Sequence, residues 1–207
     1  MPDMGLCHKS CLKDIRVLTS SLPDTQRRHV SSTCRHNSSR REPYKSVNTV
    51  RRLVSPTIDN EGKLPRKYTK GGQGVKKNIS PPLEWYNVPQ GTKSLALVVE
   101  DIDAPDPSGP LVPWTVWVVV DVPPDMKGLP EGFSGNDEQV AGIREGNNDH
   151  KIPGWRGPLM PSHGHRFQFK LFALNDKPNL GHTVTKERLL DAVDGIVLGE
   201  AVFTCFA

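Results

Sequence analysis

The sequence has few cysteines, no cysteine pair of the CxxC type and no long apolar run. Three of its four cysteines (Cys7, Cys11 and Cys34) precede residue 35, and none has a histidine at zinc-ligand spacing. The longest apolar runs, such as residues 116–120, fall far short of the roughly 18 residues of a membrane helix. No apolar signal-peptide segment opens the chain. We therefore expect a cytoplasmic protein in a reducing compartment, with no transmembrane segment and no metal or other cofactor.

Over most of the chain, basic residues do not outnumber acidic ones. Residues 1–46 hold nine basic and four acidic residues, whereas residues 47–207 hold 18 basic and 19 acidic ones. Because a nucleic-acid-binding domain carries its basic patch on the fold, no nucleic-acid partner is expected. Residues 1–46, rich in Ser and Arg and poor in aromatics, are predicted to be a disordered basic extension. An organelle transit peptide is the alternative for this segment. Residues 47–207 are predicted to form the folded domain.

Glycine and proline are abundant, at 18 and 19 residues, and helical periodicity is scarce. Runs rich in β-branched and apolar residues predict strands at 94–100, 114–122 and 165–174. Two short strands joined by a turn at 60–62 are predicted within residues 51–69. Together these features predict a mainly β fold, a two-sheet antiparallel β-sandwich with one or two short helices near the C-terminus.

One helix is predicted at residues 186–193, with Thr185 as its N-cap and Leu189 and Val193 on its buried side. Residues 121–165 hold eight glycines and six prolines. This composition predicts a long irregular segment, and such segments are usually functional or disordered.

Two aspartates follow the apolar strand 94–100. Because strand side chains alternate, Leu97, Val99 and Asp101 share one face, which carries Asp101 to the edge of an apolar pocket if that face is the core. Asp103 joins it if the strand continues. The alternative is that one of the two aspartates only caps the following turn. The Asp-x-Asp spacing also occurs in phosphoryl-transfer and calcium-binding loops, but neither the predicted fold nor Pro105 fits those sites.

His165 lies on the same face as Phe167 and Phe169, by counting back at period two along its strand. It is therefore expected at the mouth of the same kind of pocket as Asp101, although a lone histidine there is often structural. An Asp–His pair is a common polar element of functional sites. No serine or cysteine stands in a strand-turn-helix elbow, and Cys205 is isolated, so a catalytic nucleophile is not evident.

Six motifs occur in order along residues 80–203: SPPLEW, SLALVVEDIDAPD, WTVWVVVDVPPDMKGLPEG, GWRGP, HGHRFQFKLFAL and LGEAVF. Together they resemble the phosphatidylethanolamine-binding protein family, and most closely its Raf-kinase-inhibitor-like branch of bacteria and archaea, which is also present in plants. The resemblance covers roughly residues 50–207. It implies a two-sheet β-sandwich with a small pocket that binds phosphate-like anions or phospholipid head groups. Because bacterial-type members are often dimers, it also suggests a homodimer.

The resemblance assigns the pocket to particular residues. In the family the pocket contains the Asp of a D-x-D-A-P segment, which is Asp101 here with Asp103 beside it. It also contains the His of an H-R-Y motif, which is His165. The loop backbone of Gly157 and Pro158 would line the opening.

Two residues depart from the family pattern. Pro113 stands where the family usually has its first histidine, and Phe167 replaces the tyrosine of H-R-Y. Pro and Phe side chains cannot donate a hydrogen bond, so anion binding is expected to be weakened or altered. His163, Arg156 and Arg166 are candidates to replace the lost donors, but the sequence does not place them.

Three functions are compatible with these observations. The first is a non-enzymatic binding and regulatory module that takes a small anion and acts through a protein partner. The second is a scaffold with a degenerate pocket that acts through surface loops such as 121–165. The third is a hydrolase that uses Asp101 and His165 as acid and base, for which a nucleophile or metal is missing. The binding module fits the residues best.

Overall fold

The computed structural model describes residues 50, 52–71, 78–104, 113–135, 142–158 and 164–207. The predicted extension, residues 1–46, lies outside the described residues. Among the helices of the described part, none is long and apolar enough to cross a membrane.

The described part is mainly β, as predicted, with two antiparallel sheets and one α-helix. Its strands are β1 (Arg52–Val54), β2 (Leu83–Tyr86), β3 (Ser94–Asp101), β4 (Trp114–Val122), β5 (Gly128–Leu129), β6 (Arg144–Gly146), β7 (Arg166–Leu174) and β8 (Val197–Phe206). Its helices are the short 3-10 helix η1 (Arg66–Tyr68) and α1 (Lys186–Val193).

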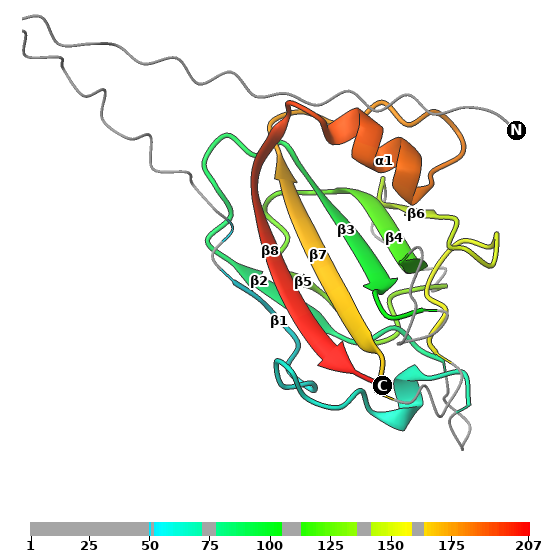
Figure 1. The fold of residues 1–207 in the computed structure, drawn as a ribbon. Coiled ribbons are helices and arrows are strands. Elements are labelled where there is room, and N and C mark those ends of the chain that lie inside the picture. Colours follow the sequence, from blue (N-terminus) through cyan, green and yellow to red (C-terminus); the bar gives the residue numbers. More distant parts are fainter. Residues whose placement is uncertain (1–49, 51, 72–77, 105–112, 136–141, 159–163) are drawn as a thin grey trace, which may run out of the picture. The chain divides into compact units, whose positions relative to one another are not determined.

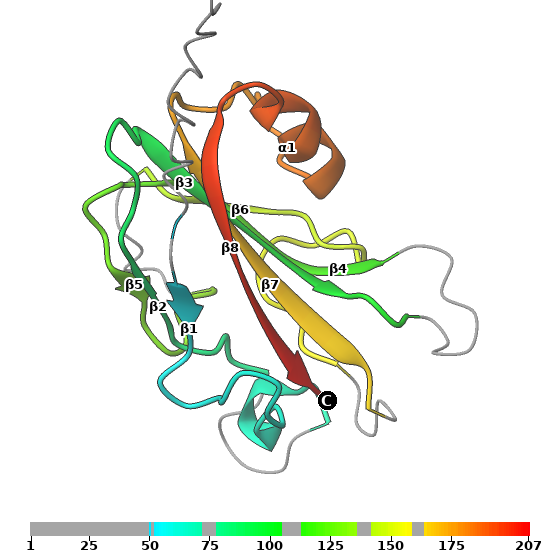
Figure 2. The same ribbon diagram turned by 60° about the vertical axis from the view of Figure 1, so that its left-hand side comes forward.

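The two sheets pack face to face (Figures 1 and 2). The smaller sheet has the strand order β1-β2-β5, and the larger has the order β6-β4-β3-β7-β8. Seen in Figure 2, the small sheet lies on one side of the large sheet and α1 lies on the other. The predicted β-sandwich is therefore confirmed, with a helix added as a third layer.

Strand β3 is the centre of the large sheet and is buried on both faces. Leu95, Leu97 and Val99 contribute to the core between the sheets, with aromatic partners such as Trp117 and Phe169. The intervening residues of β3 face α1 instead and form a second apolar cluster with its buried side chains. This double burial explains why the segment is a continuous apolar run rather than an alternating one.

Helix α1 has the predicted bounds and the predicted N-cap. The Thr185 hydroxyl accepts a hydrogen bond from the Arg188 N–H, which satisfies one of the free donors of the first turn. Leu189 and Val193 are buried against the large sheet. Lys186, the first helical residue, donates to the Glu100 carboxylate at 2.8 Å and so ties the helix to the end of β3.

Two predictions about loops were wrong in part. Within the described residues 52–69, only β1 forms a strand. The segment after the turn instead runs beside the end of β8, where Leu64 N–H donates to Phe206 O at 2.6 Å. Segment 121–165 is not wholly irregular, because it contributes β5 and β6 as edge strands of the two sheets. Both pairings depend on distant partners, which local composition does not reveal.

Truncation of a core side chain on β3 is expected to lower the stability of the fold strongly. Replacement Leu97→Ala removes a fully buried side chain from the space between the sheets, and we expect a loss of about 2–5 kcal/mol in the free energy of unfolding. Urea denaturation measures it. The matched control is Leu190→Ala on α1, whose side chain is exposed, where a change within about 0.5 kcal/mol is expected. Equal losses in the two variants would contradict this core.

Candidate functional site

Asp101 is the last residue of β3, and the strand registers define its neighbours. Its Cα pairs with that of Trp114 at the start of β4 and with that of Phe167 near the start of β7. Paired residues of neighbouring strands present their side chains on the same face. The face is the one that carries Val99 into the core, so the carboxylate lies at the rim of the apolar interior and is only 8% exposed.

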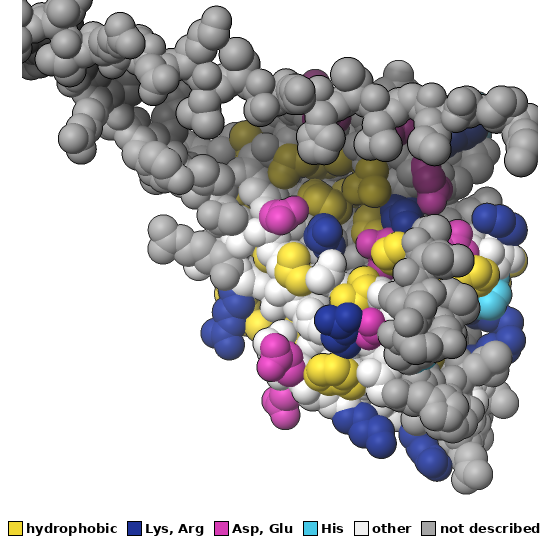
Figure 3. All heavy atoms as spheres, viewed as in Figure 1, with side chains coloured by type: hydrophobic (Ala, Val, Ile, Leu, Met, Phe, Trp, Pro, Cys, Tyr) yellow, Lys and Arg dark blue, Asp and Glu magenta, His cyan; other side chains and the backbone are white. Residues whose placement is uncertain are grey.

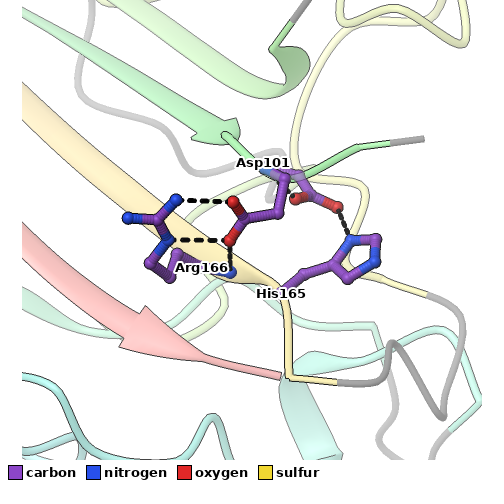
Figure 4. Close-up of polar contacts among 4 residues, drawn as sticks. Asp101, His165 and Arg166 are labelled. Carbon is purple, nitrogen blue, oxygen red and sulfur yellow. Dashed lines mark hydrogen bonds and ion pairs between the residues drawn. The ribbon is translucent and has the colours of Figure 1, made fainter. Parts of the chain in front are cut away.

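The Asp101 carboxylate contacts the imidazole of His165. The distance from Oδ2 to Nδ1 is 2.7 Å, and both side chains are nearly buried (Figure 4). The backbone around His165 is held by the end of β8, because Ala207 N–H donates to His165 O at 3.0 Å and Gly164 N–H donates to Ala207 O at 2.9 Å. The structure therefore brings Asp101 and His165 into direct contact.

Both expected roles of Asp101 occur on the same carboxylate. Its Oδ1 atom accepts the Asp103 backbone N–H at 3.1 Å, which forms a side-chain turn immediately after β3. Its Oδ2 atom faces His165. The turn therefore fixes the rotamer of the carboxylate that orients the imidazole, so capping and site formation support each other.

The carboxylate of Asp103 pairs with Arg166. Its Oδ2 accepts both the Arg166 backbone N–H and the Nε–H at 2.8 Å, and its Oδ1 accepts from Nη2 at 2.6 Å (Figure 4). The hydrogen bonds from the Arg166 guanidinium hold the pKa of this carboxyl at about 2, well below its usual value, against the opposing effect of burial. Asp103 is thus ionised at neutral pH, and Arg166 is already occupied.

The Gly157–Pro158 loop is tied to residues 68–78. Gly157 N–H donates to the Asn78 side-chain oxygen at 2.9 Å, and Pro158 O accepts from Lys70 N–H at 2.9 Å. A Cβ atom at position 157 would lie 2.0 Å from Tyr68 O, so only glycine allows this approach. Since Pro has no N–H, neither residue has a free backbone donor for a ligand.

The two positions that the resemblance marks as departures differ in burial. Phe167 is buried in the core beside Asp101, opposite Cys205 of β8. Pro113 is exposed and precedes β4, so the β4 residue opposite Asp101 is Trp114. Of the candidate replacement donors, His163 lies outside the described residues. Trp114 was not predicted as a site residue, because the segment between β3 and β4 prevents reading their register from the sequence.

The described residues contain little that would support covalent or metal chemistry. They include no group of three or more His, Cys, Asp or Glu side chains arranged to hold a metal ion. Cys205 is buried, and burial raises the pKa of its thiol to about 12, so it is not a nucleophile at neutral pH.

Comparisons with known proteins place the chain and its fold in a family. A family model described as phosphatidylethanolamine-binding protein matches residues 54–206. A UPF0098 protein of Methanothermobacter thermautotrophicus is 41% identical over 149 residues, which cover 72% of this chain and 93% of that protein. The UPF0098 protein YbhB of Escherichia coli is 38% identical over 127 residues, which cover 60% of this chain and 78% of YbhB.

Solved structures agree with these matches. A crystal structure of a phosphatidylethanolamine-binding protein homologue from Chlamydia trachomatis has a TM-score of 0.65 at 34% identity and covers 75% of this chain and 95% of its own. That of E. coli YbcL, described as a member of the mammalian PEBP family, has a TM-score of 0.64 at 29% identity, over 75% of this chain and 96% of its own.

The Asp103–Arg166 pair predicts a specific loss of stability in acid. Because the folded-state pKa of Asp103 is about 2 and the unfolded value is about 3.9, the pair stabilises the fold fully above about pH 4. That contribution is lost as the pH falls towards 2. The unfolding free energies of the wild type and of Asp103→Asn should therefore differ most above pH 4 and converge near pH 2.

Urea denaturation across this pH range provides the measurement. The control is Asp176→Asn, which removes a carboxylate whose ion pair with Lys93 is exposed, and there a nearly pH-independent and small difference is expected. A wild-type advantage over Asp103→Asn that persists unchanged at pH 2 would contradict the assignment.

Proposed function

The chain belongs to the phosphatidylethanolamine-binding protein family, and on this basis we propose that residues 47–207 form a non-enzymatic module that binds a small phosphate-like anion. The anion is a free phosphate compound or the head group of a phospholipid. The site lies at the rim of the apolar interior, where β3 ends and β7 begins. A protein partner carries the biological output.

The observation that carries this proposal is the contact between Asp101 and His165. With Nδ1–H donated to the carboxylate, the protonated imidazole presents a second donor, Nε2–H, away from Asp101. The neighbouring carboxylate fixes the orientation of the ring. An anion then accepts from Nε2, while the positive ring offsets the repulsion by Asp101.

The pocket offers fewer donors than the family pattern implies. Phe167 has no hydroxyl, and the Gly157 N–H is already bonded to Asn78. Each missing bond to a charged group corresponds to about 1.5–3 kcal/mol. We therefore expect an anion site that depends strongly on His165 and is altered in its other contacts.

The surface and the thiol chemistry agree with a small-molecule partner in a reducing compartment. On the face shown in Figure 3, Lys and Arg side chains are interspersed with Asp and Glu side chains, which gives no single-sign field for a polyanion. Cys205 is an unpaired buried thiol. We propose a cytoplasmic location and no nucleic-acid partner.

The first test measures phosphate binding by the full chain. We expect isothermal titration with inorganic phosphate to give saturable binding that is at least about tenfold weaker in His165→Ala, because one charge-assisted hydrogen bond is lost. The control is His182→Ala, which removes an exposed histidine of another loop and should leave the affinity unchanged.

Two results would overturn this proposal. One is phosphate affinity that is equal in the wild type and in a folded His165→Ala protein. The other is turnover of p-nitrophenyl phosphate by the wild type that His165→Ala abolishes, since it would mark the Asp101–His165 pair as the acid and base of a hydrolase.

A second test restores a donor. Replacement Phe167→Tyr places a hydroxyl on a ring that neighbours Asp101, and we expect phosphate to bind about tenfold more tightly because the anion gains a hydrogen bond. The control is Phe172→Tyr, which adds a hydroxyl to a buried ring facing α1 and should not change the affinity. An unchanged or weaker affinity in a folded Phe167→Tyr protein would show that this ring does not reach the ligand.

A further inference from the structure

An aromatic pair stands beside the Asp101 end of β3. Trp114, which is opposite Asp101 in the strand register, is 40% exposed and contacts the ring of His150 edge to face, with centroids 5.4 Å apart and an interplanar angle of 73°. Paired residues present their side chains on one face, so the indole and the Asp101 carboxylate lie on the same side of the large sheet.

Two cations lie near this pair. The Arg156 backbone N–H donates to Val116 O at 3.1 Å, two residues along β4 from Trp114, and Lys70 N–H donates to Pro158 O at 2.9 Å. The pKa of His150 is lowered, first by burial and then by the positive charges of Arg156 and Lys70, with Asp149 acting in the opposite direction. Both cationic side chains therefore act on one imidazole at this end of the sheet.

Neither cation is neutralised within the part of the chain that the structure describes. There, Lys67 pairs with Glu131, Arg144 with Asp121, Arg166 with Asp103 and Lys186 with Glu100. Arg156 and Lys70 have no such carboxylate partner among the described residues, and the Arg156 Nε is buried without a hydrogen-bond partner.

Such an arrangement costs stability. Two like charges that act on one histidine also repel each other, and a buried guanidinium nitrogen without a partner keeps its full desolvation penalty. Residues that violate the rules of polar satisfaction in this way are typical of binding sites, where a ligand supplies the missing charge. The ligand that fits here is an anion.

We propose that Arg156 and Lys70, next to the Trp114–His150 pair, form a cationic arm of the anion site that selects phosphate monoesters over phosphodiesters. This inference rests on the proposed function, since it adds a second group of residues to the site at Asp101 and His165. The arm replaces the donors that Phe167 and the Gly157–Pro158 loop do not provide.

The preference for a monoester follows from charge. A phosphate monoester carries about −1.5 to −2 charges at pH 7, whereas a phosphodiester carries one. The Asp101–His165 pair is neutral when the imidazole is protonated and cannot compensate a dianion alone. Arg156 and Lys70 add two positive charges, and guanidinium presents several N–H donors to phosphate oxygens. A diester leaves one of these cations uncompensated.

The test titrates the full chain with phosphorylethanolamine, a monoester, and with glycerophosphorylethanolamine, a diester that carries the same amine. We expect the wild type to bind the monoester at least about tenfold more tightly. Arg156→Gln and Lys70→Met should each weaken binding of the monoester about 10- to 100-fold, and should weaken binding of the diester much less. The matched control Lys93→Met removes one positive charge at the other end of β3 and should change neither affinity.

The outcomes separate this inference from the proposed function. If His165→Ala weakens binding and both Arg156→Gln and Lys70→Met do not, the arm is refuted and the His165 site stands. If the two cation variants weaken binding and His165→Ala does not, the arm stands and the Asp101–His165 site is refuted. Equal affinity of the wild type for monoester and diester overturns the selectivity, and absence of binding to both ligands overturns both proposals.

The ring signals of His150 give an independent readout, assigned by their loss in His150→Gln. In the ligand-free protein, Arg156→Gln should raise the pKa of His150, because a positive neighbour is removed while Lys70 and Asp149 remain. Saturation of the wild type with phosphorylethanolamine should raise it too. A His150 titration that neither change affects would overturn the arm even if the variants bind less tightly.

Discussion

The antiparallel register between β3 and β7 determines how the polar residues at this end of the two strands meet. It places Asp101 opposite Phe167. His165, just before β7, therefore reaches the Asp101 carboxylate, and Arg166, the first residue of β7, reaches Asp103. Because side chains alternate along a strand, a slip of one residue would turn Asp101 away from the core face and separate it from His165. Buried apolar residues on both faces of β3 make such a slip very costly, so the core fixes the geometry of the site.

The charged residues at this end of the sandwich form two separate sets of contacts. The pair of Asp103 with Arg166 is complete in itself, with three hydrogen bonds and an ionised carboxylate, and it closes the turn after β3. Among the described residues, the contact with Asp101 uses only the Nδ1 atom of His165, and Arg156 and Lys70 have no acidic partner. The two aspartates, separated by one residue in the sequence, therefore have different partners: Asp103 pairs with Arg166 and Asp101 with His165.

The sequence predicted the central strands, the helix and the meeting of Asp101 with His165, because each depends on local periodicity within long apolar segments. It did not predict the small edge strands β5 and β6 or the course of residues 59–64 beside β8, since these pair with distant partners. The same limit applies to the site. The contact of His150 with Trp114 and the approach of Arg156 and Lys70 to His150 are produced by loops whose contacts no local pattern encodes.

Double burial of β3 also restricts how the site can change over time. Its backbone groups are paired to β4 and β7 along both edges and covered by apolar side chains on both faces, so opening its amides to hydrogen exchange requires disruption close to global unfolding. Asp101 is thus attached to the least mobile part of the molecule. A change in the shape of the proposed site would therefore have to come from the loops that carry Lys70, His150 and Arg156 rather than from β3.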